Sequence, residues 1–400
     1  MSRALKILWI NRFCLADTSS GAAMAARDML TQLSLRGANM AVLGMTCFDK
    51  PVGRDSIQDQ LDAQDGASLF TVEQGRLTHN LIPTRDWRAN EVRLSELDAL
   101  YKLYHQVLGD FEPDLVWFFG GHSFDMLIPS EAKRRGIKTV AYVPNGSYMS
   151  NEWCRDVDLI VTETNATAQM YKDRVGFDAQ TVGVFIEPEA YVAKTHSRTA
   201  VTFVNPVLEK GGGLVAQLAI AMEEKRPDIP FHIVESRGKW DETLEQVQST
   251  LGKDHRPLTN VKVIGHTNDM RPVYAESRVH LVPSLWWEGA GRVVVEAMLN
   301  GIPTIVTNRG GPPELMGNAG FKLDLKDAFF EPPYGKLLPA KALDRVVSLI
   351  ERIFDDEDLY ADLSAKAFKV GETQHSIKRN GDRLNAMLRS LCAEKLDQTV

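Results

Sequence analysis

The chain has 400 residues, of which 44% are hydrophobic and 25% are charged. This composition is typical of a soluble globular protein, and the length exceeds one ordinary core, so two domains of roughly 150–200 residues are expected. The formal net charge of −7 argues against nucleic acid as a partner, because phosphate binding normally requires a basic face.

The N-terminal stretch MSRALKILWINRFC has only a short apolar run. It lacks the apolar core and cleavage site of a signal peptide, and no run in the chain approaches the ~18–20 apolar residues of a membrane span. The four cysteines are scattered without paired spacing, which is typical of reduced thiols in a cytosolic protein and indicates no metal site. The acidic balance and the lack of a basic amphipathic helix favour at most peripheral membrane contact. We therefore expect a cytoplasmic protein.

Short apolar runs alternate with helical patterns along the first half of the chain. The predicted strands are 5–10, 40–45, 115–119, 139–143 and 159–162. The predicted helices are 22–35, 95–108 and 131–135. This alternation indicates a doubly wound α/β unit with crossover connections.

Residues 187–199 (EPEAYVAKTHSRT) break the pattern and are expected to form a linker. The alternation then restarts, with predicted strands 200–204, 231–234, 261–264, 278–282 and 303–307. The predicted helices are 214–225 and 292–299, followed by the amphipathic helices 343–354 and 377–394. The fold class is therefore α/β, with two Rossmann-like doubly wound domains facing an interdomain cleft. We expect an N-terminal domain of residues 1–187, a C-terminal domain of 188–375, and a helix within 376–400 that packs back on the N-terminal domain.

Candidate site residues in the first half lie where predicted strands lead into helices, which is where open parallel sheets bind ligands. Gly21 opens a predicted helix whose amides can attract an anion, although taken alone the pattern favours an ordinary N-cap and tight turn. His122 follows two glycines at a strand end and can hydrogen-bond a ligand hydroxyl or carbonyl. A loop histidine with protein partners is the alternative.

Lys210 opens the stretch KGGGL just after a predicted strand. The glycines permit a close turn into a helix, and the lysine supplies a compact positive charge for a diphosphate. The stretch does not match the Walker A pattern GxxxxGK[ST]. A solvated lysine before a helix is the alternative.

The stretch PSLWWEGAGRVVVEAM, residues 283–298, places Glu288 and Glu296 eight positions apart. A tight Gly-Ala-Gly loop leads into a helix whose first amides form an anion site, and Arg292 adds charge. A carboxylate buried without partners is costly, so Glu296 is expected to face a polar ligand or solvent. Eight residues span at most ~12 Å in a helix, about the reach from the sugar to the ribose of a nucleoside diphosphate sugar. Two surface glutamates on an amphipathic helix are the alternative.

The longer run PSLWWEGAGRVVVEAMLNGIPTIVTNRGGPPEL resembles the nucleotide-sugar-binding signature of retaining glycosyltransferases of family 4, which have the GT-B fold. That signature is Glu, seven residues, Glu, a small helix, Gly-x-Pro, a strand, and Gly-Gly-x-Pro-Glu. The matching residues here are Glu288, Glu296, Gly301, Pro303, Gly310, Gly311, Pro313 and Glu314. The stretches SGAAMAARDML and VKVIGHTNDMRPVYAESRVHLVPS also resemble family segments, so the resemblance covers most of the chain.

The resemblance implies a role for each matching position. Glu288 would contact the donor sugar, Glu296 would hold the ribose hydroxyls, and Lys210 would neutralise the diphosphate. The implied catalytic residues are Glu288, His122 and Lys210; the implied donor-binding residues are Gly21, Asn205, Arg237, Gly265, His266, Gly289, Ala290, Gly291, Arg292 and Glu296. The family usually has Gly-Arg where this chain has Asn205-Pro206. Half of the expected diphosphate clamp is therefore missing, unless Arg292 or Arg237 compensates.

The implied reaction is transfer of a hexosyl group from a UDP- or GDP-linked sugar to an acceptor hydroxyl, with retention at the anomeric carbon. The acceptor class stays open among sugars, glycans, lipids and small molecules. Residues 84–93 (TRDWRANEVR) offer aromatic and basic groups to line its path, or form an exposed loop and helix start. Two alternatives are a nucleotide-sugar epimerase of the same fold and a sugar-nucleotide-binding protein that has lost catalysis.

The resemblance implies neither a metal nor another cofactor, with the nucleotide sugar as co-substrate. The triplet Asp156-Val157-Asp158 matches the Asp-x-Asp metal site of the other main glycosyltransferase fold. It precedes a buried-looking strand, however, which argues against a metal role there.

Overall fold

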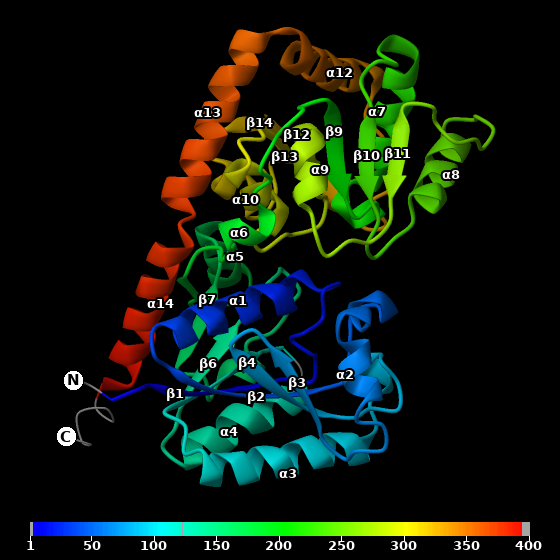
Figure 1. Ribbon diagram of the computed structural model, residues 1–400. Coiled ribbons are helices and arrows are strands. Elements are labelled where there is room, and N and C mark those ends of the chain that lie inside the picture. Colours follow the sequence, from blue (N-terminus) through cyan, green and yellow to red (C-terminus); the bar gives the residue numbers. More distant parts are fainter. Residues whose placement is uncertain (1–2, 122, 394–400) are drawn as a thin grey trace. The chain divides into compact units, whose positions relative to one another are not determined.

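The computed structural model describes residues 3–121 and 123–393. Contacts divide the chain into two compact units, one of Met1–Phe185 with Ile377–Val400 and one of Ile186–Ser376. Each unit is a mainly parallel sheet with helices on its faces (Figure 1), which confirms the predicted pair of Rossmann-like α/β domains.

Within the described residues, the first unit has an eight-stranded sheet in the order β3-β4-β2-β1-β5-β6-β7-β8. The strands are β1 (Lys6–Ile10), β2 (Asn39–Met45), β3 (Phe70–Gln74), β4 (Leu77–Ile82), β5 (Leu115–Phe119), β6 (Lys138–Tyr142), β7 (Leu159–Thr162) and β8 (Gln180–Thr181). Neighbours pair in parallel except β3 and β4, which form an antiparallel hairpin at one edge. The sequence analysis did not predict this hairpin, because its strands are short and largely polar.

Helices on both faces close the first unit. They are α1 (Gly21–Leu35), α2 (Gln58–Asp62), α3 (Leu94–Asp110), α4 (Leu127–Arg134), α5 (Asn165–Arg174) and α14 (Ile377–Leu391), with short 3₁₀ turns η1 (Pro51–Gly53), η2 (Asp55–Ile57), η3 (Ala89–Glu91), η4 (Ser123–Met126) and η5 (Glu152–Cys154). The last helix, α14, joins α1 in one core cluster through Leu384 and Leu388. The Arg36 guanidinium also donates to the Lys378 carbonyl and to Asp382, which ties the chain end to this unit.

The second unit has a six-stranded parallel sheet within the described residues, in the order β11-β10-β9-β12-β13-β14. The strands are β9 (Ala200–Val204), β10 (Phe231–Val234), β11 (Val261–Ile264), β12 (Ser277–Val282), β13 (Thr304–Thr307) and β14 (Gly320–Leu323). Counted within this unit the order is 3-2-1-4-5-6, the arrangement of dinucleotide-binding sheets. The direction of winding reverses between β9 and β12, and such sheets bind ligands at that point.

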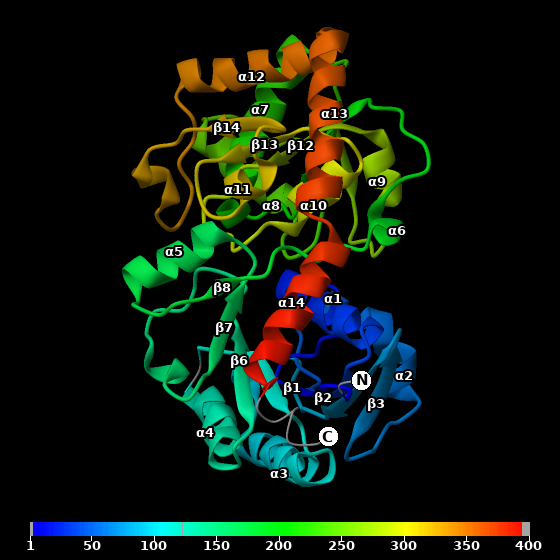
Figure 2. The ribbon, with the colours of Figure 1, turned by 90° about the vertical axis from the view of Figure 1, so that its left-hand side faces the viewer.

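Helices also cover both faces of the second sheet (Figure 2). They are α6 (Pro188–Tyr191), α7 (Gly212–Lys225), α8 (Trp240–Thr250), α9 (Arg271–Glu276), α10 (Arg292–Leu299), α11 (Pro312–Met316), α12 (Ala340–Asp355) and α13 (Glu357–Gln374), with η6 (Leu208–Lys210) and η7 (Asp327–Phe330). The main core lies on the side of α7, α8 and α12, and Tyr274, Ala297 and Ile302 form a smaller cluster on the other side. No helix in the part of the chain that the structure describes is long and apolar enough to cross a membrane.

Candidate functional site

The loops that follow β9 and β12 bring two of the sequence-predicted residues together. The two strands are neighbours in the sheet and run in parallel, so their carboxyl ends lie at the same edge. Lys210 ends the turn η6 after β9, and Glu288 lies in the loop between β12 and α10. The two side chains, 78 positions apart in the sequence, form a direct hydrogen-bonded ion pair.

Glu288 is nearly buried, with 8% of the residue exposed. The hydroxyl of Ser284 donates a second hydrogen bond to the same carboxylate oxygen, at 2.9 Å. Burial raises the pKa of Glu288, but the nearby charge of Lys210 and the hydrogen bonds to the carboxylate outweigh burial and hold this pKa below its ordinary 4.5. Glu288 is therefore a carboxylate at neutral pH. The Lys210 ammonium also lies 5.0 Å from the centroid of the Trp286 ring.

Glycines allow three backbone segments to meet at this pair. A Cβ at Gly211, which has φ +84°, would lie 2.1 Å from the Pro283 carbonyl oxygen, and one at Gly311 would lie 2.2 Å from the Gly289 carbonyl oxygen. The Gly311 amide donates to the Glu288 carbonyl at 2.9 Å. The loops that carry Lys210 and Glu288 are thus fixed by contacts that only glycine permits.

Two helices begin beside the pair without a side-chain cap among the described residues. Gly211 is the N-cap of α7, and Gly291, with φ +85°, is the N-cap of α10. Gly289, Ala290 and Gly291 form the loop before α10, as the sequence predicts. The first amides of a helix favour an anion, and Lys210, which precedes α7 and pairs with the loop before α10, adds to that preference.

Glu296 has protein partners that its position in the sequence does not reveal. It is only 4% exposed, and its Oε2 accepts a hydrogen bond of 2.7 Å from the Tyr274 hydroxyl. Arg292 Nε lies 3.7 Å from Oε1 of the same carboxylate. The sequence argument assumed no internal partner, whereas α9 and the start of α10 supply two. Burial, and then the charge and hydrogen bond of Glu296, raise the pKa of Tyr274, so this hydroxyl stays a donor.

Asn205 occupies the position where the resembled family has a glycine before an arginine. Its φ of +67° lies in the left-handed region, which asparagine tolerates better than most residues. Its side-chain oxygen accepts a hydrogen bond of 3.1 Å from the Arg237 amide. Asn205 thus links the loop after β9 to the loop after β10, which carries Arg237, but the contact is to the Arg237 backbone, so it places no cation.

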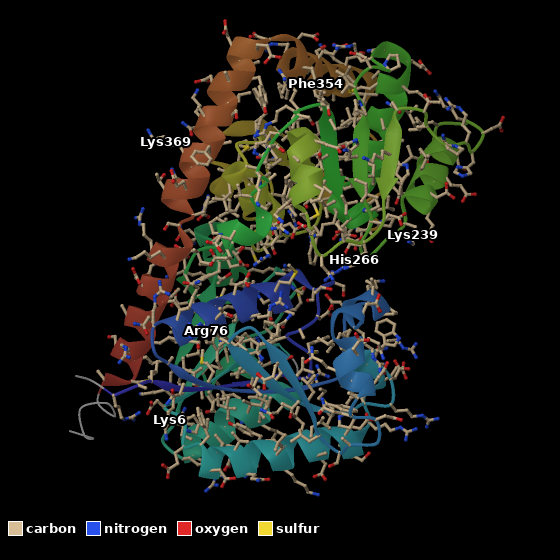
Figure 3. The ribbon with its side chains drawn as sticks, viewed as in Figure 1. Lys6, Arg76, Lys239, His266, Phe354 and Lys369 are labelled. Atoms are coloured by element: carbon tan, nitrogen blue, oxygen red, sulfur yellow. The ribbon has the colours of Figure 1, made fainter. Side chains whose placement is uncertain are left out.

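The other predicted residues fall at several positions. Gly265 is exposed and His266 is partly buried in the loop after β11 (Figure 3). Gly21 is the first residue of α1 in the first unit, where the Ser20 side chain caps the Ala23 amide at 3.5 Å. His122 lies outside the described residues. Asp156 pairs with Lys133 and Arg155, and Asp158 accepts hydrogen bonds from Thr139, so both have protein partners.

The sequence analysis missed Ser284, Trp286, Tyr274 and Tyr191. Ser284 and Trp286 stand inside the quoted signature, so their closeness to Glu288 was a usable signal. Tyr274 meets Glu296 from 22 positions away, and the Tyr191 hydroxyl accepts from Arg292 at 3.3 Å across 101 positions. No local pattern marks either tyrosine.

Comparison with known proteins agrees with this architecture. Residues 193–370, which contain both loops of the site, match the family model "Glycosyl transferases group 1". The spore coat protein SA of Bacillus subtilis is 32% identical over 128 residues, which cover 30% of this chain and 33% of that protein. A GDP-mannose-dependent monoacylated alpha-(1-6)-phosphatidylinositol monomannoside mannosyltransferase of Corynebacterium glutamicum is 24% identical over 322 residues, which cover 71% of this chain and 78% of that protein.

Solved structures resemble the whole chain at low sequence identity. A glycosyltransferase from Rickettsia africae has a TM-score of 0.68 at 14% identity, covering 97% of this chain and 98% of that one. The Anabaena protein HepE in complex with UDP-glucose has a TM-score of 0.69 at 15% identity, covering 96% and 100%. Sucrose-phosphate synthase from Thermosynechococcus elongatus has a TM-score of 0.70 at 12% identity, covering 98% and 100%.

The fold is therefore that of the GT-B glycosyltransferases, with two Rossmann-like domains. At the level of sequence, the match to the Glycosyl transferases group 1 model is confined to residues 193–370, which lie in the second unit.

Proposed function

We propose that the chain transfers a hexosyl group from a UDP- or GDP-linked sugar to an acceptor hydroxyl, with retention at the anomeric carbon. The observation that carries this proposal is the Lys210–Glu288 pair, which lies beside the uncapped starts of α7 and α10 where the winding of the second sheet reverses. That place combines a lysine cation, an ionised carboxylate and the N-terminal ends of two helices. A nucleoside diphosphate sugar needs such groups for its diphosphate and for its hydroxyls.

The proposed chemistry uses the pair in two roles. The diphosphate leaving group gains negative charge as the glycosidic bond breaks, so Lys210 and the helix amides stabilise the transition state more than the bound donor. When Lys210 turns toward the diphosphate, Glu288 loses its ion-pair partner and can accept hydrogen bonds from the sugar hydroxyls. Glu296, held by Tyr274, would present its remaining acceptor capacity to the ribose.

Retention without a protein nucleophile follows if the leaving phosphate accepts the proton of the incoming hydroxyl on the same face of the sugar. The charge on the diphosphate would be neutralised by protein groups, with Lys210 first, so the proposed reaction requires no metal. The acceptor would be a sugar, a glycan, a lipid or a small molecule.

The relatives support both UDP-linked and GDP-linked sugars as candidate donors. The Corynebacterium mannosyltransferase is named as GDP-mannose-dependent, and the Anabaena protein is solved with UDP-glucose. Because they differ in the base, both series of donors belong in the first test. Incubation of the full chain with UDP- or GDP-linked glucose, mannose, galactose or N-acetylglucosamine together with sugar and lipid acceptors, followed by proton NMR of the glycoside formed, measures turnover and anomeric configuration together.

The expected result is release of UDP or GDP from one donor with an anomeric product of the donor's own configuration. An inverted product would contradict the retaining mechanism, and an epimerised sugar with free nucleotide would show an epimerase instead.

A second candidate, a sugar-nucleotide-binding protein without catalysis, is favoured by Asn205-Pro206. Pro206 stands where the family has the arginine of the diphosphate clamp, and the Asn205 side chain is bonded to the Arg237 amide, so neither residue supplies a second cation. Tight binding of a nucleotide sugar, with no release of nucleotide over hours in the presence of sugar and lipid acceptors, would establish this candidate.

A further inference from the structure

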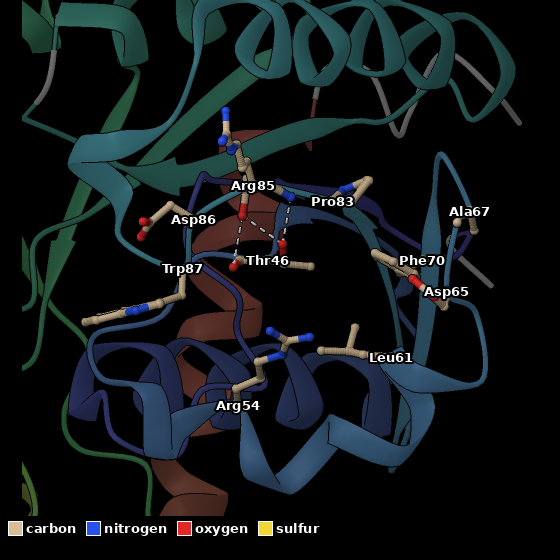
Figure 4. A pocket seen from close by; sticks show the side chains of 12 residues that line it. Thr46, Arg54, Leu61, Asp65, Ala67, Phe70, Pro83, Arg85, Asp86 and Trp87 are labelled. Carbon is tan, nitrogen blue, oxygen red and sulfur yellow. Dashed lines mark hydrogen bonds between the residues drawn. The ribbon is translucent and has the colours of Figure 1, made fainter.

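The first unit contains a cavity of about 410 Å³ at the edge of its sheet (Figure 4). It lies where β2 and β4 end and where the antiparallel strand β3 begins, with η1, η2 and α2 around it. The residues that carry the argument are Thr46, Arg54, Leu61, Phe70, Arg85 and Trp87. The carboxyl ends of parallel strands are the edge at which α/β sheets bind ligands, so the location is suited to a substrate.

The polar rim of this cavity is held in place by the backbone. The Thr84 amide donates to Thr46 Oγ1 at 2.8 Å, and the Thr84 hydroxyl donates to the Thr46 carbonyl at 3.1 Å. The Arg85 amide donates to Glu96 Oε1 at 2.7 Å, which fixes the loop to α3. The loop 83–87 is therefore a built wall of the cavity and not a free surface loop.

The charges on the cavity wall do not cancel. Asp86 is bound through both oxygens by Arg88, at 2.9 and 2.7 Å, which lowers the pKa of Asp86 to about 2. The guanidinium groups of Arg54 and Arg85 have no hydrogen bond or ion pair to any residue in 3–121 or 123–393. Outside the Asp86–Arg88 pair, the charged lining residues are thus two arginines and one aspartate, Asp65.

The side chains of the wall divide into an apolar part and a cationic part. Figure 4 shows the Arg54 side chain extending between Leu61 and Thr46, while that of Arg85 points away from the other lining side chains. Trp87 and Phe70 supply two aromatic rings at opposite ends of the same view. An aromatic ring packs against the apolar face of a sugar ring, and a guanidinium binds phosphate oxygens in pairs.

We propose that this cavity binds the acceptor and that the acceptor is a sugar carrying a phosphate group. The sugar ring lies against Trp87, and the phosphate lies at Arg54, with a smaller contribution from Arg85. This inference rests on the proposed function, because of the candidate functions only a glycosyltransferase needs an acceptor substrate besides the nucleotide sugar. The source of the phosphorylated ring is either a soluble sugar phosphate or a phospholipid whose headgroup is a polyhydroxylated ring like that of a sugar, as in phosphatidylinositol.

The test compares binding of phosphorylated and neutral sugars by the full chain. Isothermal titration uses glucose, mannose and galactose together with their 1-phosphates and 6-phosphates. Sedimentation with vesicles of phosphatidylcholine, or of equimolar phosphatidylcholine and phosphatidylinositol, covers the lipid source. The variants are Arg54→Gln, Arg85→Gln and, as a matched control, Arg76→Gln, since Arg76 is an exposed arginine in the turn at the far end of the β3–β4 hairpin.

We expect wild type to bind one phosphorylated probe at least tenfold more tightly than its neutral counterpart. Arg54→Gln should remove about tenfold of that affinity and Arg85→Gln less, whereas Arg76→Gln should bind like wild type. Binding in the titration alone assigns a soluble acceptor, and binding to the phosphatidylinositol vesicles alone assigns a lipid one. Trp87→Ala should weaken phosphorylated and neutral sugars by the same factor.

The inference is overturned if wild type binds none of the phosphorylated probes, or binds them no better than the neutral sugars, or if Arg54→Gln and Arg76→Gln behave alike. Titration of UDP and GDP into the same variants separates this result from a failure of the proposed function. If wild type binds UDP or GDP but no phosphorylated sugar, the acceptor inference alone is refuted. If wild type binds neither UDP nor GDP, the proposed function is refuted.

Discussion

The carboxyl edges of the two sheets differ in how their charges are satisfied. At the second sheet, Lys210 pairs with Glu288, while Glu296 is held by Tyr274 and Arg292, and glycine contacts fix the loops. At the first sheet, Arg54 and Arg85 line an open cavity without a partner among residues 3–121 and 123–393. The second edge is thus preorganised around internal ion pairs that a ligand must exchange, whereas the first recognises a ligand with free side chains. Changes at the first edge should alter specificity, and changes at the second should abolish activity.

The largest effect is expected for Lys210→Met at the second edge. Loss of the cation leaves the developing charge on the diphosphate without its main partner, so turnover should fall by about 10²–10³-fold. The rate of nucleotide release from the donor measures this loss. The matched control is Lys225→Met at the other end of α7, where Lys225 forms an exposed pair with Asp344. Equal turnover in both variants would remove Lys210 from the site.

Next in size is the effect of adding a methyl group where the loops meet. Gly211→Ala places a Cβ 2.1 Å from the Pro283 carbonyl oxygen at a φ of +84°, so the unfolding free energy should fall by about 3–4 kcal/mol. Gly252→Ala has a similar φ of +67° and meets nothing within 4 Å among the described residues, so it should cost only about 1 kcal/mol. Urea unfolding of both variants measures the difference. Equal losses would show that the loops are not locked by this contact.

A smaller effect is expected at low pH, from one buried histidine in the sheet of each unit. His79 in β4 and His280 in β12 are fully buried, and their ring nitrogens have no partner among the described residues. Burial lowers the pKa of His79 to about 4 and that of His280 to about 3, both below the ordinary 6.5. The unfolded chain therefore takes up protons first, so stability is full above pH 6.5 and is lost as the pH falls toward 4.

Replacing either histidine by phenylalanine should flatten that pH dependence, by about 1–2 kcal/mol at pH 5 for each site. Chemical unfolding at pH 7 and pH 5 measures the change in slope. Unchanged pH dependence in His280→Phe would mean that this imidazole is not held neutral in the second sheet.

Much of the fold could be predicted from the sequence, because buried parallel strands appear as uninterrupted apolar runs. The strands at 115–119, 200–204 and 231–234 were predicted with the bounds that the structure gives them. The β3–β4 hairpin could not be predicted, since edge strands need only one apolar face and its residues are mixed. That hairpin forms part of the cavity wall, so the whole wall could not be predicted, although the segment 84–93 that the sequence suggests for the acceptor's path supplies four of its lining residues.

The candidate site in the second unit was predicted in part. The glycines and acidic residues of the signature identified the loops. At its Gly-Gly pair a Cβ would lie within 2–3 Å of a neighbouring backbone atom, so no other residue fits there and the glycines are visible in the sequence. The partners of Glu296 could not be predicted, since Tyr274 and Tyr191 reach it or its neighbour Arg292 from distant elements. A charged residue inside an apolar run therefore indicates that Glu296 has a polar partner. The sequence does not show whether the protein or a ligand provides that partner.

The central claim is that Lys210 exchanges Glu288 for the diphosphate of a donor, and calorimetric titration of UDP and GDP tests it most directly. Glu288→Gln removes the competing charge, so the preferred nucleotide should bind several-fold to about tenfold more tightly than to wild type, although turnover is lost. Lys210→Met should bind it at least tenfold more weakly. Nucleotide affinity that is unchanged in both variants, or weakened in Glu288→Gln, would contradict the claim.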